Sequence, residues 1–235
     1  MKKRFWGPIC YVLTILGILA AAHWGSRTAT VLAQTTPVAR AHCLVIDPGH
    51  GGEDGGALSV TGKPESGYNL EIALRLNDLL RLLGWDTRLT RSTDTAIYTS
   101  GQTIAQKKVS DLKERVRIVE QTPGAVLLSI HQNTFSDSRY SGAQVFYART
   151  HGSQALAENL QEALVKVLNP GSNRKAKKSD GVYLMERISH PGVLIECGFL
   201  SNREEEARLG EPNYQKQLCS VLASTVAQFL TVNNG

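Results

Sequence analysis

Four side chains in this sequence are of the types that bind metal ions and move protons: His50, Glu65, His131 and Glu196. Neutral imidazole nitrogens and carboxylate oxygens are ordinary zinc ligands, and a catalytic zinc takes three protein ligands and leaves one position open. His50, Glu65 and His131 can fill the three positions, and Glu196 can then accept a proton from an attacking water. The four residues are far apart in sequence, so their spacing also fits histidines that only form hydrogen bonds in loops.

Three of these residues follow apolar runs that are typical of buried strands. Residues 43–47 lead to His50 through a proline and a glycine, residues 125–130 lead directly to His131, and residues 192–195 lead directly to Glu196. Ligands of open α/β sheets bind beyond the carboxyl ends of the strands. We therefore expect these three side chains to lie together at one edge of a sheet.

The rest of the chain alternates between helical and extended patterns. Apolar periodicity predicts helices over residues 68–85, 110–121, 153–168 and 212–232, and further strands over residues 87–90, 143–147 and 182–185. Such alternation indicates an α/β fold with a mostly parallel central sheet flanked by helices on both faces. We expect a single catalytic domain over residues 41–235.

The N-terminal segment has the pattern of an export signal. Lys2, Lys3 and Arg4 precede an apolar run over residues 9–22, which is too short for a comfortable membrane span. Val31 and Ala33 offer a cleavage site, but it lies far from the apolar run. Residues 1–33 are therefore expected to be either a cleaved signal or a retained N-terminal membrane anchor, followed by a linker over residues 34–40.

Composition excludes several other classes of protein. The four cysteines show no CxxC spacing, so neither a disulfide scaffold nor a cysteine-rich metal site is expected. The net charge of +5 is modest and partly due to the N-terminal segment; it favours an anionic polymer such as a cell wall and predicts no nucleic-acid partner. The glycines around His50 read PGHGG, which is not a phosphate-binding loop.

Four motifs, in chain order, carry a resemblance to a known family. They are VIDPGHGG at residues 45–52, Glu65 five residues before Leu70, SIHQN at residues 129–133, and VLIECGFLSN at residues 193–202. They resemble the motifs of the zinc-dependent N-acetylmuramoyl-L-alanine amidases, and the similarity extends from about residue 41 to the C-terminus. The sequences SGAQVFY at residues 141–147 and NRKAKK at residues 173–178 are most similar to the spore-cortex amidases of the CwlD type.

The resemblance implies an activity and a role for each residue. His50, Glu65 and His131 would hold one zinc ion per chain, and Glu196 would be the catalytic carboxylate. The substrate would be peptidoglycan, cut at the amide between the lactyl group of N-acetylmuramic acid and L-alanine of the peptide stem. Asn133 is also expected to contact the substrate.

A biological role and a location also follow from the resemblance. A role in spore-cortex maturation, as the first step toward muramic lactam, and in germination is implied, with an activating partner protein in sporulation as a possibility. Vegetative wall remodelling or cell separation is the alternative. The protein would work outside the cytoplasmic membrane, secreted to the wall, anchored facing it, or in the space around the forespore.

Several interpretations remain open at the level of sequence. Arg174 and its basic neighbours could bind carboxylates of the substrate or form a solvated charged loop. Cys197 could be a nucleophile, but it should face away from the site if Glu196 faces into it. His151 and His190 could orient the zinc ligands or lie on the surface. A non-catalytic peptidoglycan-binding protein and a zinc hydrolase of another amide are the rival functions.

Overall fold

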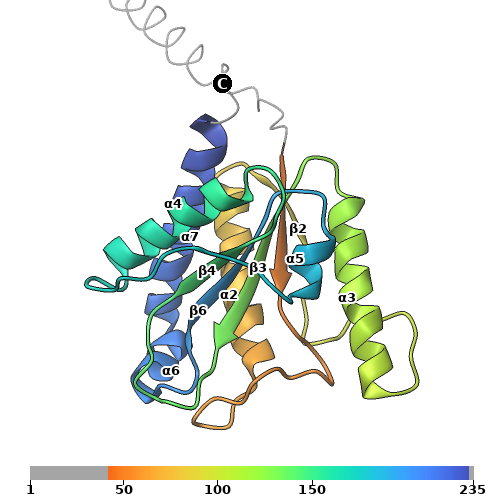
Figure 1. The fold of residues 1–235 in the computed structure, drawn as a ribbon, viewed down its shortest axis with the longest axis horizontal. Helices are drawn as coiled ribbons and strands as arrows, with labels where there is room; N and C mark the ends of the chain where they lie inside the picture. Colours follow the sequence, from red (N-terminus) through yellow and green to blue (C-terminus); the bar gives the residue numbers. More distant parts are fainter. Residues whose placement is uncertain (1–41, 233–235) are drawn as a thin grey trace, which may run out of the picture. The chain divides into compact units, whose positions relative to one another are not determined.

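The structure is a computed structural model that describes residues 42–232. Its centre is a six-stranded sheet with the strand order β2-β1-β3-β6-β4-β5 (Figure 1). The pairs β1/β2, β1/β3, β3/β6 and β4/β5 are parallel, and β4 runs antiparallel to β6. The strands are β1 (Cys43–Pro48), β2 (Asp86–Leu89), β3 (Ala125–Asn133), β4 (Gln144–Tyr147), β5 (Lys177–Lys178) and β6 (Gly192–Phe199).

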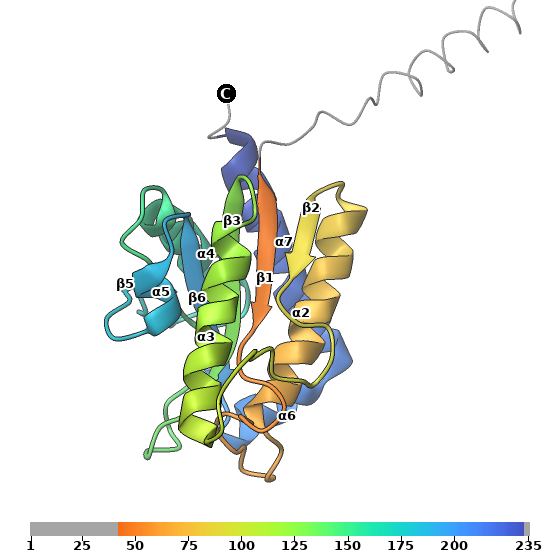
Figure 2. The same ribbon diagram turned by 90° about the vertical axis from the view of Figure 1, so that its right-hand side faces the viewer.

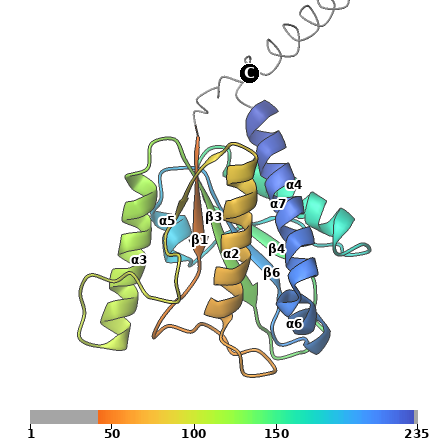
Figure 3. The same ribbon diagram turned by 180° about the vertical axis from the view of Figure 1, so that it is seen from behind.

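Helices cover both faces of this sheet, as the sequence predicted. Figure 3 shows α2 and α7 lying across one face, and Figure 2 shows α3 and α5 on the other side. The helices are α2 (Glu65–Leu82), α3 (Ile104–Glu120), α4 (Ser153–Val167), α5 (Tyr183–Arg187), α6 (Arg203–Gly210) and α7 (Pro212–Val232). The fold is therefore a three-layered α/β domain.

The core is divided by the sheet into two apolar clusters, one on each face. Side chains alternate along each strand, so neighbouring residues enter opposite clusters. In β1, Leu44 and Ile46 pack with α2, α4 and α7, whereas Val45 packs with α3 and α5. The three central strands are buried on both faces, which explains why their sequences are continuous apolar runs.

Two helices begin earlier than their apolar periodicity indicates. α2 begins at Glu65 rather than residue 68, directly after Pro64, whose extended backbone (ψ 146°) sets the entry to the helix. α3 begins at Ile104 rather than residue 110, because Thr103 and Gln106 form a capping box at its N-terminus. The first turn of α2 is mostly polar, and Ile104 at the start of α3 is exposed, so an apolar stripe facing the core does not reveal either start.

Three features differ from the sequence prediction. Residues 182–185, expected to be a strand, lie at the start of α5, because short apolar runs are compatible with either structure. β4 returns antiparallel to β6, which makes the sheet mixed at this edge. α6 was not predicted, since its sequence is highly charged; the Asn202 side chain accepts hydrogen bonds from the backbone N–H groups of Glu204 and Glu205 and starts it.

The predicted export segment and linker, residues 1–40, lie outside the described residues. Among the helices that the structure describes, none is long and apolar enough to span a membrane. The described cysteines are all free, and Cys197 and Cys219 are buried. This agrees with the expectation that the thiols are packing residues rather than a disulfide framework.

Candidate active site

The loop after β1 presents His50 in a left-handed backbone conformation. Its φ of 61° is uncommon for a residue other than glycine, and such strain is concentrated at functional sites. The preceding Gly49 has no room for a side chain, since a Cβ there would lie 2.2 Å from the imidazole ring of His131. The sequence of this loop therefore allows two histidines from different strands to approach each other.

Two buried arginines hold this loop by its carbonyl oxygens. Arg115 donates from Nη1 to the oxygen of Pro48 (2.8 Å) and from Nη2 to that of His50 (2.7 Å). Arg91 donates from Nε to the same Pro48 oxygen (3.0 Å) and from Nη2 to that of Gly49 (3.0 Å). Three successive carbonyls are thus fixed, and a shift of the loop would leave buried donors without partners.

Asp47 compensates the buried charge of Arg115. The side chains are 1% and 2% exposed, and the carboxylate contacts Nη1 of the guanidinium. Thr90 and Ser129 each donate a hydroxyl hydrogen bond of 2.7 Å to Asp47. Burial by itself raises the pKa of Asp47, but Arg115 and the two hydroxyls outweigh it and leave the pKa below its ordinary 3.8. Asp47 is therefore ionised at neutral pH.

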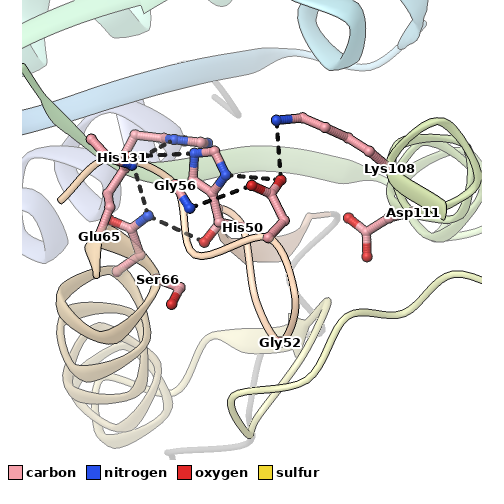
Figure 4. Close-up of polar contacts among 12 residues, drawn as sticks. His50, Gly52, Gly56, Glu65, Ser66, Lys108, Asp111 and His131 are labelled. Carbon is pink, nitrogen blue, oxygen red and sulfur yellow. Dashed lines mark hydrogen bonds and ion pairs between the residues drawn. The ribbon is translucent and has the colours of Figure 1, made fainter. Parts of the chain in front are cut away.

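Glu65 lies between the two histidines (Figure 4). Its Oε2 is 3.3 Å from Nε2 of His50, and its Oε1 is 3.0 Å from Nδ1 of His131. The two imidazole rings meet edge to face with centroids 5.1 Å apart. One ligand atom from each of the three residues falls within 4.8 Å of the other two. This is the geometry of a three-residue metal-binding group.

The carboxylate of Glu65 is also fixed by groups other than the histidines. The backbone N–H of Ala57 donates to Oε2 (3.0 Å), and the backbone N–H of Gln132 (3.1 Å) and the side chain of Asn69 (3.2 Å) donate to Oε1. Burial raises the pKa of Glu65, but its hydrogen bond to His131 and the charges of both histidines dominate and lower the pKa to about 2. Glu65 is therefore a preorganised anion.

His50 has a second carboxylate behind its imidazole ring. Oδ2 of Asp54 lies 3.0 Å from Nδ1 of His50, and the Gly56 backbone N–H donates to the other oxygen of Asp54 (3.3 Å). A carboxylate at the far nitrogen of a ligating histidine fixes the ring orientation and its tautomer. Gly56 also leaves room for this arrangement, because a Cβ there would lie 2.6 Å from Oε2 of Glu65.

Glu196 lies across from His131 on the neighbouring strand. β3 and β6 are parallel, and their register pairs His131 directly with Glu196. Burial raises the pKa of Glu196 to about 7, with His131 acting in the opposite direction. Its buried Oε2 has no hydrogen-bond partner among the described residues. A buried carboxylate with a free oxygen and a pKa near neutrality suits a group that exchanges protons with a ligand.

One cavity connects these groups. It encloses about 220 Å³ between the carboxyl end of the sheet, α3 and α5. His50, His131 and Glu196 line it together with Lys108, with Leu184 of α5 and with Val182, which precedes that helix. The sequence-predicted residues His50, Glu65, His131 and Glu196 are therefore brought together, and they leave space for a small part of a substrate.

Asn133 and Arg174, the two residues expected to contact substrate, lie in different parts of the structure. Asn133 is two residues beyond His131, and its carbonyl accepts a hydrogen bond from Leu200 (2.8 Å). Arg174 donates to the carbonyl of Ser141 (3.1 Å), and its guanidinium lies 5.1 Å from the ring centroid of Phe199. Arg174 lines a separate cavity rather than the one that contains His50. Substrate binding by either residue stays a prediction.

The other candidates from the sequence do not belong to the site. Cys197 is buried in the core cluster on the opposite side of β6 from Glu196, and burial raises its pKa well above 9.0. It is a packing residue, as the strand alternation indicated. The idea that His151 and His190 orient the zinc ligands is wrong, because both lie near Pro191, at the start of β6, whereas Glu196 follows toward its end.

Several residues of the site were not identified from the sequence. They are the supports Asp47, Asp54, Asn69, Arg91 and Arg115. Asp47 and Asp54 both lie close to His50 in sequence. The position of Asp47, a polar residue near the end of an otherwise apolar strand, could have identified it as part of the site. Arg91 and Arg115 come from distant segments, and no local pattern distinguishes them from surface arginines.

Several known proteins are similar to this chain in sequence and in fold. A germination-specific N-acetylmuramoyl-L-alanine amidase of Bacillus subtilis (strain 168) is 37% identical over 191 residues, covering 80% of this chain and 79% of the relative. The CwlD amidase from Clostridioides difficile, solved in complex with the GerS lipoprotein, matches with a TM-score of 0.78 and 36% identity, covering 81% of this chain and 99% of that one. The catalytic domain of the amidase CwlV, from Bacillus (Paenibacillus) polymyxa var. colistinus, matches with a TM-score of 0.66 and 29% identity, covering 81% and 99%.

The fold, the site and these matches define the class of the protein as a hydrolase of peptidoglycan. Residues 44–228 match the N-acetylmuramoyl-L-alanine amidase family, and the chain belongs to it. Its sequence and fold fit the CwlD-type amidases of that family.

The buried pair Asp47 and Arg115 generates a prediction about stability. Asp47→Asn leaves the guanidinium of Arg115 buried without its counter-charge, and we expect a loss of about 3–5 kcal/mol in the free energy of unfolding at pH 7. Because the folded protein lowers the pKa of Asp47, its contribution is present above 3.8 and is lost as pH falls further through the folded pKa. The difference in the free energy of unfolding between wild type and Asp47→Asn should therefore become smaller in acid.

Urea unfolding of the metal-free proteins at several pH values measures this difference. Asp180→Asn is the matched control, since Asp180 is 73% exposed and pairs with an exposed arginine. Equal stability of Asp47→Asn and wild type at pH 7 would contradict the stabilising role.

Proposed function

We propose that the chain hydrolyses the lactyl–L-alanine amide of peptidoglycan with one zinc ion held by His50, Glu65 and His131. The observation that supports this most directly is the convergence of their ligand atoms within 4.8 Å, beside a cavity that contains Glu196. Two imidazoles and one carboxylate are an ordinary ligand set for a catalytic zinc with an open position. When bound, zinc would polarise the scissile carbonyl and make the attacking water more acidic.

The residues of the chain prepare this site before any substrate arrives. Arg91 and Arg115 fix the backbone of the His50 loop, Asp54 orients the His50 ring, and the backbone of Ala57 fixes Glu65. The donor atoms are therefore held near their positions at little further cost in conformational entropy.

Glu196 is the proposed proton carrier. Its position opposite His131, its burial and its unpartnered Oε2 suit a carboxylate that accepts a proton from the attacking water. The same carboxyl can then donate this proton to the departing nitrogen of L-alanine. Burial favours the neutral form of Glu196, which is the form needed for the second transfer.

The biological role that we propose is maturation of the spore cortex. Removal of the peptide from muramic acid is the first step toward muramic lactam, and the relative at 37% identity is described as germination-specific. Vegetative remodelling is the competing role, because the relatives also include amidases whose names do not mention germination, such as LytC of Bacillus subtilis (strain 168), 31% identical over 182 residues.

We further propose that a partner protein activates the enzyme and that it works outside the cytoplasm. The CwlD amidase of Clostridioides difficile was solved in complex with a lipoprotein, which supports a search for a comparable partner. Export is supported by the basic and apolar pattern of residues 1–33 and by the location of peptidoglycan outside the cytoplasmic membrane.

Two substitutions separate metal binding from proton transfer. Glu196→Gln should keep one zinc per chain and lose hydrolysis by about 10²–10⁴-fold, because the amide cannot accept the proton. His131→Ala should lose both zinc and hydrolysis. Metal analysis together with the masses of products from purified muropeptides measures both properties.

The control for these variants is Glu162→Gln, on the exposed side of α4. Full activity of Glu196→Gln would contradict its role, and full zinc content of His131→Ala would contradict the ligand set. If an activator is needed, wild type alone should bind zinc weakly, and a co-purified partner should strengthen that binding.

The spore-cortex role predicts a change in the cortex of a deletion strain. Muramic lactam should be absent, because the peptide stays attached to the lactyl group of muramic acid. The spores should also germinate poorly. Muropeptide analysis of purified cortex measures the lactam. Normal lactam content would assign the enzyme to vegetative wall instead.

Export predicts where the protein is found and what its N-terminus is. The protein should occur in the membrane or wall fraction, beginning near residue 34 if the segment is cleaved and at residue 1 if it is an anchor. N-terminal sequencing of the fractionated protein distinguishes the two forms, and recovery in the cytosolic fraction would contradict export.

A further inference from the structure

Lys108 extends from α3 toward the metal-binding group (Figure 4). Its side chain is half exposed, and it lines the same cavity as His50 and Glu196. The ammonium nitrogen lies 3.2 Å from Oδ2 of Asp54, and Nδ1 of His50 lies 3.0 Å from that same oxygen. A positive charge therefore stands next to the metal-binding group, on the side of α3.

The other cation that lines this cavity, Arg115, is buried and uses four of its five N–H donors within the protein. Its guanidinium donates to Asp47, Asp111 and the backbone carbonyls of the His50 loop, and its side chain is 2% exposed. The ammonium of Lys108 carries three donors and contacts one carboxylate oxygen. Of the lysines and arginines among the described residues that line the cavity, Lys108 is the one whose free donors are exposed to a ligand.

The neighbouring lysine on α3 is engaged elsewhere. Lys107 donates to both carboxylate oxygens of Glu53 (2.9 and 2.8 Å), and its ammonium lies 5.1 Å from the ring centroid of Tyr98. Lys107 and Tyr98 line a small adjoining hollow rather than the catalytic cavity. Lys108 lines both this hollow and the catalytic cavity, so of the two consecutive lysines it is the one that reaches the cavity.

The substrate carries a suitable anion close to the bond that is cut. In the peptide stem, L-alanine is followed by D-glutamate joined through its γ-carboxyl, so that its α-carboxylate remains free one residue from the scissile amide. Some stems carry an amide in place of this carboxylate. A group that binds the carboxylate would therefore distinguish two natural forms of the stem.

We propose that Lys108 binds the α-carboxylate of the D-isoglutamate residue and makes the enzyme selective for stems that are not amidated. The proposal rests on the function proposed above. The proposal requires that, with the scissile amide at the metal-binding group, the second residue of the stem lies on the side of the cavity that Lys108 lines. An ammonium recognises such a carboxylate through charge-assisted hydrogen bonds.

The carboxylates near Lys108 mean that an anionic substrate needs a cation in this part of the cavity. Asp54 and Asp111 also line this side of the cavity, and their carboxylates would repel an incoming anion. Asp111 is paired with Arg115, whereas Oδ2 of Asp54 contacts both His50 and Lys108. The ammonium thus offsets the charge of Asp54 and offers donors to the substrate on its exposed side.

The structural alternative is that Lys108 only positions Asp54 and, through it, His50. Asp54 is already held by contacts with His50 and the Gly56 backbone. A half-exposed ion pair adds little to such an arrangement. The two roles differ in what they change: positioning alters zinc affinity and the hydrolysis of every substrate, whereas carboxylate binding alters the preference between substrates.

The test compares two substrates that differ only at this carboxylate, N-acetylmuramoyl-L-alanyl-D-isoglutamate and its D-isoglutamine counterpart. With the full-length, zinc-loaded wild type, we expect kcat/KM to favour isoglutamate by about tenfold, the lower range for a hydrogen bond to a charged group. Lys108→Met should raise KM for isoglutamate and bring the ratio close to one, and Lys108→Arg should restore most of the preference. Lys113→Met, on an exposed position of the same helix, is the control and should keep the wild-type ratio.

Three outcomes would overturn the inference. Equal use of the two substrates by wild type would do so, as would an equal loss on both substrates in Lys108→Met, or a loss of zinc in that variant with an unchanged ratio. Hydrolysis of neither substrate by zinc-loaded wild type would instead count against the proposed function itself. The two failures are therefore distinguishable.

Discussion

The site depends on a buried charge arrangement rather than on the ligands alone. Asp47 and Arg115 are nearly inaccessible, and together with Arg91 they fix the carbonyl oxygens of three consecutive residues that end at His50. Burying these charges is tolerable only because each has several hydrogen-bond partners. In return the backbone of His50 is held in a left-handed conformation that a free loop would rarely adopt.

The rest of the domain brings three further groups to this fixed loop. The parallel pairing of β1, β3 and β6 sets His131 and Glu196 at one edge of the sheet, and α2 directs Glu65 from its first turn into the gap between the histidines. Small residues allow the close approach, since Gly49 and Gly56 occupy positions where a Cβ would meet His131, Glu65 or His50. Packing at these glycines is as much a part of the site as the polar groups.

The two carboxylates of the site are placed in opposite environments. Glu65 is surrounded by donors and histidines, which lower its pKa to about 2, whereas Glu196 is buried with few partners, which raises its pKa to about 7. Pairs of titratable groups with separated pKa values are a mark of divided roles in catalysis. A ligand that is always anionic and a carboxyl that exchanges its proton are the two roles that an amide hydrolase of this kind needs. Lys108 adds a third charge, on the side where the peptide stem would lie.

Apolar periodicity was enough to predict the α/β class and most of the strands and helices, because it is a property of short segments. Local motifs likewise drew attention to His50, Glu65, His131 and Glu196, which the fold brings close together. The starts of α2 and α3 and the charged α6 were set at the helix N-termini, by Pro64, by a capping box and by Asn202, and the direction of β4 was set by pairing with β6. The support of the His50 loop by Arg91 and Arg115, and the approach of Lys108 to the cavity, become visible in the folded chain alone. These roles depend on contacts between segments 40 or more residues apart, and no local pattern encodes them.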